Sequence, residues 1–174
     1  MKVAPPLQTI AVGVVVERSQ GVTEWSPFAW RPLAVLVGEP AAAPWTGLED
    51  DGVRATFYAG TAEIELHRTA AEHYRVNLST GHPLLWVGLR PTGAEPPYEV
   101  LAVTADPAEG EAMTEAGNDL IEAVPMPPAI EDAVAAFVAE HHIDRTFVKR
   151  KRDRANPEAL ARRTPAGGGE KGNP

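Results

Sequence analysis

Short runs of alternating or β-branched residues dominate the first part of the chain. Seven such runs predict strands, because each lies between turns rich in glycine and proline. They cover residues 7–18, 33–40, 53–60, 61–68, 73–79, 83–90 and 98–105. No helical pattern separates these runs, and this order favours an antiparallel sandwich or a partly closed barrel over a parallel fold with alternating helices.

The connections between these runs carry further predictions. We expect the runs 53–60 and 61–68 to be two strands joined tightly at Ala59 and Gly60. Residues 21–32, "GVTEWSPFAWRP", hold two prolines and three aromatic residues, which predicts a loop. Residues 41–52, "AAAPWTGLEDDG", predict a turn-rich connection.

Helical patterns begin only after these strands. Asp106 is a candidate N-cap, Pro107 fits the first helical position and Gly117 is a stop signal, which together predict a short capped helix. After an extended piece at 120–127, a second helix is predicted from Pro128. Its apolar face, which we expect to lie across the sheet, consists of Ile130, Val134, Phe137 and Val138. The expected fold class is α+β: a mostly antiparallel sheet or open barrel of about seven strands with two C-terminal helices.

Length and charge divide the chain into a body and a tail. A chain of 174 residues with 44% hydrophobic residues fits one domain, and we predict a single globular α+β domain at 1–148. Residues 149–174 form a basic tail with little apolar content, which we expect to be disordered. From Arg145 to Pro174 the charge is +6, so the net charge of −8 leaves −14 on residues 1–144. The body therefore repels polyanions, and the tail attracts them.

The chemistry of a recognisable enzyme is missing from the sequence. Without cysteine, the chain has no disulfide, thiolate zinc site, iron–sulfur ligand or cysteine nucleophile. It contains no phosphate-binding loop, dinucleotide-binding glycine motif or G-x-S-x-G elbow. We predict no catalytic residue, cofactor or metal site. An enzymatic role stays open, but a non-enzymatic one is favoured.

The N-terminus predicts a strand. Its short apolar run follows two prolines, and no small-residue cleavage site comes after it. No apolar stretch approaches the length needed to cross a bilayer. We expect a cytoplasmic protein without a membrane partner.

The strongest local signal is "HHIDRTFVKRKRDR" at 141–154. Neighbouring histidines on a helix point about 100° apart, which disfavours a shared metal ion and suits interaction with the helix dipole. Ile143 and Phe147 could continue the apolar stripe of the helix and anchor a basic docking strip. We favour protein docking over a nucleic-acid arm, because the acidic body opposes the latter. The candidate contact residues are His141, His142, Phe147, Lys149, Arg150, Lys151 and Arg152.

A second candidate contact region lies at 25–31, where Trp25, Phe28, Trp30 and Arg31 occur close together, and its predicted contact residues are Trp25, Trp30 and Arg31. Aromatic residues and arginine are typical of protein hot spots and of base-stacking platforms. The alternative is an aromatic loop that folds back to cap the end of the sheet. The sequence leaves this choice open.

Seven segments carry a resemblance to a known family. They read "VVVER", "WRPLAVL", "YAGTAEIELHR", "YRVNLS", "PLLWVGLR", "EAVPMP" and "FVAEHHIDRTFVKRKR". In this order, over residues 9–152, the chain resembles small proteobacterial proteins of unknown function that are often encoded beside molybdenum-dependent formate dehydrogenases. The resemblance implies a role near the assembly or function of that enzyme. We therefore expect a non-catalytic accessory or assembly protein whose partner is a formate dehydrogenase subunit or an assembly factor.

Some members of this family carry the label of molybdopterin-guanine dinucleotide biosynthesis protein A, a molybdenum-cofactor guanylyltransferase. That label implies a start of the type L-x-G-G-x-S-x-R-x-G-x-D-K on a parallel α/β fold. Residues 7–22, "LQTIAVGVVVERSQGV", lack the paired glycines and the lysine. An enzyme or carrier in molybdenum-cofactor biosynthesis remains one alternative, and a nucleic-acid-binding regulator acting through the basic tail is another.

Overall fold

The computed structural model describes residues 4–115 and 117–143, which belong to the first of two units of the chain, Met1–Ile143. The described residues form seven strands, three α-helices and one short 3-10 helix, η1 (Arg68–Ala70). The strands are β1 (Gln8–Thr23), β2 (Ser26–Val37), β3 (Thr46–Asp50), β4 (Arg54–Leu66), β5 (Leu84–Pro91), β6 (Tyr98–Thr104) and β7 (Leu120–Pro125). The helices are α1 (Ala71–Ser79), α2 (Pro107–Thr114) and α3 (Pro128–His141).

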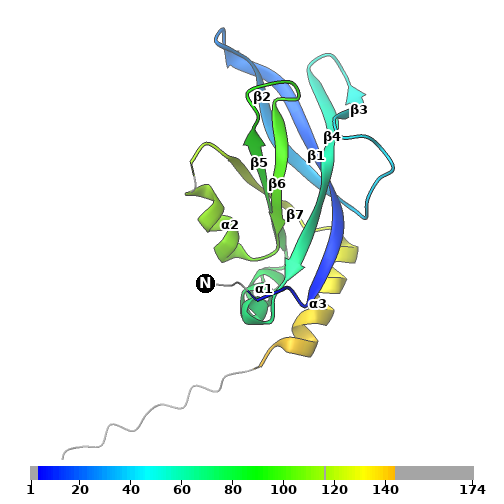
Figure 1. Cartoon of the computed structure of the whole chain (residues 1–174), viewed down its shortest axis with the longest axis vertical. Helices are drawn as coiled ribbons and strands as arrows, with labels where there is room; N and C mark the ends of the chain where they lie inside the picture. Colours follow the sequence, from blue (N-terminus) through cyan, green and yellow to red (C-terminus); the bar gives the residue numbers. More distant parts are fainter. Residues whose placement is uncertain (1–3, 116, 144–174) are drawn as a thin grey trace, which may run out of the picture. The chain divides into compact units, whose positions relative to one another are not determined.

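The strands form two antiparallel sheets, with the orders β2-β1-β4-β3 and β6-β5-β7. β4 lies beside β6, and β2 lies beside β7, so the sheets approach each other on both sides (Figure 1). No ladder joins them among the described residues, and the barrel is not closed. The predicted α+β class, with about seven antiparallel strands and two helices near the C-terminal end, is confirmed.

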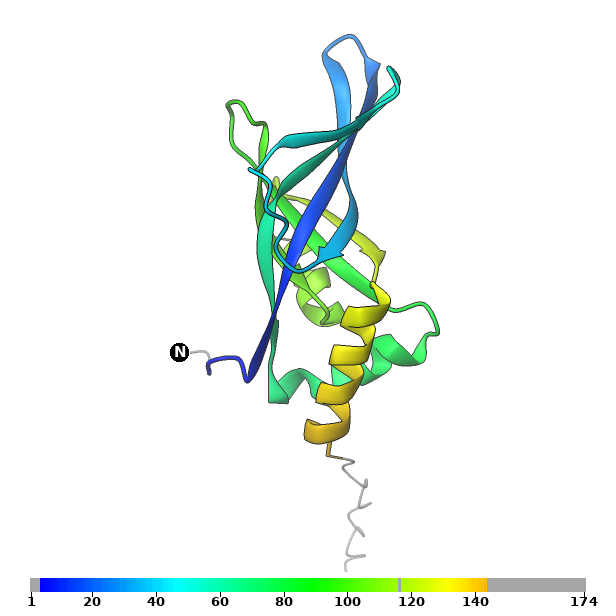
Figure 2. The same cartoon turned by 90° about the vertical axis from the view of Figure 1, so that its right-hand side faces the viewer.

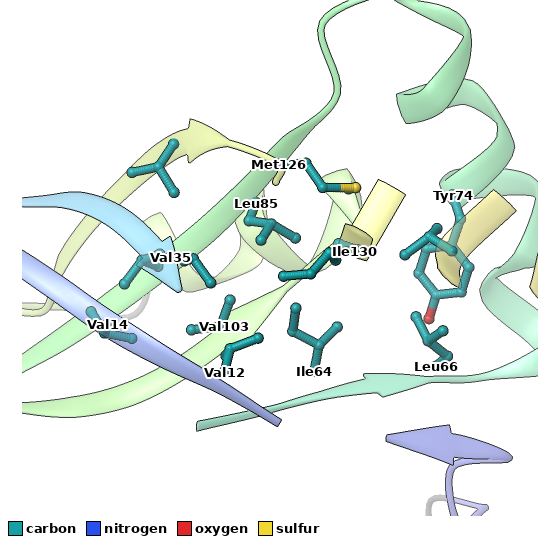
Figure 3. Packing of buried hydrophobic residues seen from close by; sticks show 14 of the residues in the cluster. Val12, Val14, Val35, Ile64, Leu66, Tyr74, Leu85, Val103, Met126 and Ile130 are labelled. Atoms are coloured by element: carbon teal, nitrogen blue, oxygen red, sulfur yellow. The ribbon is translucent and has the colours of Figure 1, made fainter. Parts of the chain in front are cut away.

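The core lies between the two sheets and is closed at one end by α1 and α3 (Figure 2). Alternate residues Val12, Val14 and Val16 of β1 are fully buried, as a strand with one face on the core requires. Figure 3 shows Ile130 at the start of α3 among side chains of both sheets, including Ile64 and Leu85.

Both predicted helices are confirmed. The carboxylate of Asp106 accepts a hydrogen bond from the amide of Ala108, and Pro107 begins α2. On α3, Ile130, Val134 and Phe137 are buried at helical spacing, and Val138 is partly buried. Local capping was a sufficient signal for α2, and periodicity was a sufficient signal for α3, which buries the face that the sequence marks as apolar.

One strand prediction is wrong. Residues 73–79 belong to helix α1, which buries Ala71, Tyr74 and Asn77 at intervals of three and leaves Val76 about half exposed. The ring of Tyr74 packs edge-on against Phe137 of α3, with 6.0 Å between the ring centroids. Contacts with α3 and the core thus select the helix over the alternating pattern.

Three connections also differ from their predictions. Residues 53–60 and 61–68 do not form a tight turn; most of both runs belongs to one strand, β4, in which Ala59 is an extra residue opposite Val14 and Val15 of β1. The predicted connection 41–52 contains the edge strand β3. The predicted loop 21–32 is the end of a β1–β2 hairpin, with Thr23 paired to Ser26.

Candidate contact surface

The β1–β2 hairpin extends beyond the rest of its sheet. Pairing of β1 with β4 ends at Ser19 opposite Arg54, whereas pairing with β2 continues through Gln20 opposite Phe28 to the final turn. Residues 20–28, here called the hairpin tip, therefore form a two-stranded ribbon. The tip lies at the end of the fold opposite α1 and α3 (Figures 1 and 2).

The hairpin tip exposes large apolar side chains. Val22 is 100% exposed, Trp25 is 95% exposed and Phe28 is 43% exposed. Tryptophan is usually well buried in folded proteins, so a nearly free indole at a projecting turn is unusual. Covering a Trp side chain removes about 150–250 Å² from water, which corresponds to about 4–6 kcal/mol before the costs of association. The folded chain leaves the side chain of Trp25 in water, whereas a bound partner that covered it would gain this free energy.

Trp30 has a different environment from Trp25. Its ring packs against Trp45, Phe57 and Tyr98, with centroid distances of 5.7, 5.8 and 6.3 Å. These four aromatic residues, here called the aromatic cluster, are partly buried and come from β2, β4, β6 and the segment before β3. Trp30 is therefore mainly a packing residue at the base of the hairpin.

Arg18 connects the hairpin tip with the aromatic cluster. Its guanidinium lies 4.5 Å from the ring centroid of Phe28 and 5.4 Å from that of Phe57. Such cation–π contacts hold the arginine over the rings and stiffen the ribbon. Phe28 belongs to the aromatic residues predicted at 25–31, whereas Arg18 and Val22 were not predicted; for Val22, an apolar residue beside a turn was the available signal.

Arg31, the third residue predicted in this region, points to a buried carboxylate. Its Nε donates a hydrogen bond of 2.9 Å to Oε1 of Glu17 on the neighbouring strand. Glu17 is only 7% exposed. Of the three predicted residues, Trp25 projects into solvent, Trp30 packs in the aromatic cluster and Arg31 forms an ion pair.

The turn between β3 and β4 lies at the same end of the fold as the hairpin tip (Figure 1). Val53 in this turn is 63% exposed, and Leu48 of β3 is 47% exposed. Two neighbouring acids shape the turn: Asp50 accepts from the amide of Gly52, and Asp51 accepts from those of Val53 and Arg54. These backbone hydrogen bonds lower the pKa of Asp51. The exposed apolar surface at this end is therefore presented by ordered turns.

The histidines at the end of α3 make contacts within the fold. His141 is the last residue of the helix, and its ring centroid lies 4.5 Å from that of Phe137. His142 pairs through Nε2 with the carboxylate of Glu72 on α1, which also pairs with Arg75. The hydrogen bond from Arg75, followed by that from His142, lowers the pKa of Glu72 to about 2. This ion cluster fastens the end of α3 to α1.

The remaining predicted contact residues, Phe147, Lys149, Arg150, Lys151 and Arg152, lie outside the described residues. The predicted tail at 149–174 also lies outside them. Their proposed role in docking stays a prediction from the sequence.

His73 and Asp106 form a histidine–carboxylate pair. Nδ1 of His73 lies 2.9 Å from Oδ1 of Asp106. Pairs of this kind also orient the histidine in acid–base catalytic sites. Within the described ranges, however, His73 has no hydrogen bond to a hydroxyl nucleophile, and no group of three metal-ligating residues is found. Because Asp106 is the N-cap of α2, the pair joins α1 to that helix.

No helix in the described part of the chain combines the length and apolar composition needed to span a membrane.

A comparison with known protein families finds a match over most of the chain. The model of a family described as "Protein of unknown function (DUF3305)" matches residues 11–151. No curated protein and no solved structure matches the chain. The match spans all seven strands except the start of β1, and it includes the hairpin tip and the aromatic cluster.

Proposed function

The chain belongs to the family of unknown function DUF3305, and from its surface we propose that it is a non-catalytic accessory protein that binds another protein through the hairpin tip. The observation that carries this proposal is the 95% exposure of Trp25 on a projecting hairpin, whose base is held by the contacts of Arg18 with aromatic rings. Tryptophan is enriched among the residues that dominate protein interfaces. A preorganised hairpin also loses little conformational entropy on binding.

The proposed partner is a formate dehydrogenase subunit or an assembly factor of that enzyme. Support for this partner comes from the sequence resemblance to proteins encoded beside molybdenum-dependent formate dehydrogenases. The surface requires an apolar pocket that accepts Trp25 and Val22. The basic residues 149–152 would add attraction to an acidic patch of the partner, which mainly accelerates association.

A carrier of a molybdenum-pterin nucleotide is the principal alternative, and charge opposes it. Residues 4–143 carry six arginines and no lysine against twenty aspartates and glutamates. Arg31, Arg75 and Arg90 pair with carboxylates, and Arg18 lies over aromatic rings. An anionic ligand would find few available cations on this surface. The same balance opposes nucleic-acid binding by the body.

Affinity purification from the native host tests the proposal. The full chain is compared with the double variant Val22→Ser/Trp25→Ala and with the control Val76→Ser, which changes a valine on α1 that is 49% exposed. We expect the wild type and the control to recover formate dehydrogenase subunits, and the double variant to recover at least about tenfold less, as for a hot-spot truncation. The melting temperature of the double variant should agree closely with that of the wild type, because Val22 and Trp25 bury almost nothing.

Two results would overturn the proposal. Equal recovery of the partner by the wild type and the tip variant would remove the hairpin tip as the contact site. Purification of the wild type with a stoichiometric molybdenum-pterin nucleotide, and without a protein partner, would favour the carrier alternative. A further variant that ends at Asp144 separates the contribution of the basic residues, which should affect the association rate and its salt dependence.

A further inference from the structure

A surface cleft of about 490 Å³ opens beside the aromatic cluster, in a place that the hairpin tip does not occupy. It lies between β4, the residues that precede β3 and the β5–β6 hairpin. Its walls include Trp45 and Tyr98, two prolines, Pro44 and Pro96, and two acids, Glu95 and Glu99. This volume is within the range of sites that bind small ligands or short peptide segments.

Trp45 holds a strained backbone conformation in the wall of this cleft. Its φ of 68° is rare for a bulky residue, and such a conformation persists only where the surrounding structure maintains it. Packing maintains it: the ring lies 5.7 Å from Trp30 and 6.1 Å from Phe57 between centroids. The amide of Trp45 also donates to the carbonyl of Tyr58. Residues strained in this way are concentrated at ligand clamps and other functional sites.

Tyr98 supplies the second aromatic residue of the cleft. Both Trp45 and Tyr98 contact Trp30, which therefore supports the two rings from behind. Both rings remain partly exposed. Gly60 is part of the lining and adopts a φ of +140°, where a side chain would be strained. A Cβ at this position would lie 3.7 Å from Val100 and 3.9 Å from Pro44, both cleft residues, so glycine keeps this part of the cleft open.

The charge of the cleft is negative. Glu95 and Glu99 are exposed, and among the residues that the structure describes the lining includes no lysine, arginine or histidine. Arg90 lies opposite Glu99 in the β5–β6 pairing, but its guanidinium donates two hydrogen bonds to the carboxylate of Asp119. This arrangement disfavours an anionic ligand and favours a cation, which can pair with the carboxylates and stack on the rings.

We propose that this cleft binds an extended, proline-containing segment of another protein that carries an arginine or lysine beside the proline. Proline-rich segments adopt a preformed extended helix and dock into grooves lined by aromatic residues. Trp45 and Tyr98 provide these rings, and Glu95 and Glu99 provide the complement to the basic side chain. The site is separate from the hairpin tip and does not depend on the proposed role of Trp25.

The test uses the ¹⁵N-labelled full chain and a synthetic peptide, acetyl-Ala-Pro-Pro-Arg-Pro-Pro-Ala-amide, followed by nuclear magnetic resonance. We expect saturable shifts of the Trp45 indole and of the amides of Gly60, Thr61 and Val100. A peptide with glutamate in place of arginine should not bind, because the carboxylates of Glu95 and Glu99 would repel its own carboxylate. A peptide with alanine in place of the prolines should bind several-fold more weakly, because it must lose more conformational entropy.

A matched pair of charge variants tests the site itself. Glu95→Gln/Glu99→Gln should weaken the arginine peptide about threefold to tenfold, since each exposed ion pair contributes little. The control Glu111→Gln/Glu115→Gln changes two exposed acids at α2 and should leave the affinity unchanged. The variant Val22→Ser/Trp25→Ala should also retain it, which separates this inference from the proposed function. Absence of shifts at millimolar peptide, equal binding of the glutamate peptide or an unaffected Glu95/Glu99 variant would overturn the proposal.

Discussion

Nε of Arg31 lies 2.9 Å from Oε1 of Glu17, where the two residues face each other across β1 and β2. The two partners differ in environment: the side chain of Glu17 is 9% exposed, and that of Arg31 is 48% exposed. A buried carboxylate depends strongly on its partner, because loss of the partner leaves a desolvated charge without compensation. The pair therefore fixes the base of the hairpin that carries Trp25.

Replacing Arg31 should destabilise the fold through Glu17. We expect Arg31→Met to lower the free energy of unfolding by about 2 kcal/mol, less than for a fully buried pair because Arg31 is half exposed. The double variant Glu17→Gln/Arg31→Met should recover part of the lost free energy of unfolding, since it also removes the buried carboxylate that has lost its partner. Chemical denaturation measures both values. Arg68→Met is the control on an exposed arginine, and equal effects of the two arginine substitutions would contradict the assignment.

Asn77 should be among the most sensitive polar residues of the fold. Its Nδ2 donates to the carbonyls of Leu84 and Ala105 at 2.8 and 3.0 Å, and its Oδ1 accepts from the amide of Leu84 at 3.0 Å. Asn77 is only 4% exposed. Asn77→Ala should cost about 3 kcal/mol, because buried backbone groups lose their partners. Urea denaturation measures this cost, with the exposed Ser79→Ala on the same helix as the control; similar losses in both variants would contradict the assignment.

Gly110 should not tolerate alanine, although alanine normally favours a helix. A Cβ at this position of α2 would overlap the indole of Trp86. The helix or the ring must then shift, and overpacking of this kind costs about 1–3 kcal/mol, more than the gain in helix propensity. Thermal unfolding of Gly110→Ala is compared with Glu111→Ala, the exposed neighbour, which should be neutral or slightly stabilising. An increase in melting temperature for Gly110→Ala would show that α2 is not held this closely against β5.

Glu72 should make stability depend on pH in the acidic range. Its pKa falls from 4.5 to about 2, mainly through the hydrogen bond from Arg75 and then through that from His142. A lowered pKa means that the folded state favours the carboxylate, so the contribution is complete above about pH 4.5 and disappears as pH falls toward 2. Glu72→Gln should melt about 1–3 °C lower at neutral pH, and the difference should shrink below pH 4.

Thermal scans from pH 3 to 7 measure this dependence, with Glu63→Gln on β4 as the control. A difference between the wild type and Glu72→Gln that stays constant over this range would show that the α1–α3 contact does not depend on the carboxylate.

Local sequence signals were sufficient where an element buries the face that its own pattern marks. β1 and α3 belong to this class, whereas α2 is defined by its cap, in which Asp106 and Pro107 begin the helix. These signals act within a few residues. They predicted the α+β class because strand-forming segments precede both C-terminal helices.

Two local patterns were compatible with more than one structure, and long-range contacts selected between them. In residues 73–79 the alternation of Tyr74, Val76 and Leu78 fits a strand, but the hydrogen bonds of Asn77 to residues near β5 and β6 and the contact of Tyr74 with α3 require a helix. In β4, Gly60 was predicted to lie in a tight turn, but the strand continues through it with a bulge opposite β1. A single sequence does not state which distant strand will lie beside such a segment.

The amino-acid sequence shows that aromatic residues and arginine gather at 25–31, but their roles do not follow from it. The pairing register decides these: β4 stops opposite Ser19, so the hairpin continues alone and leaves Trp25 in solvent. Trp30, five residues along, meets rings from β4, β6 and the segment before β3. The exposure of a side chain depends on which strands lie beside it. Those strands are far apart in the sequence and come together only in the tertiary structure.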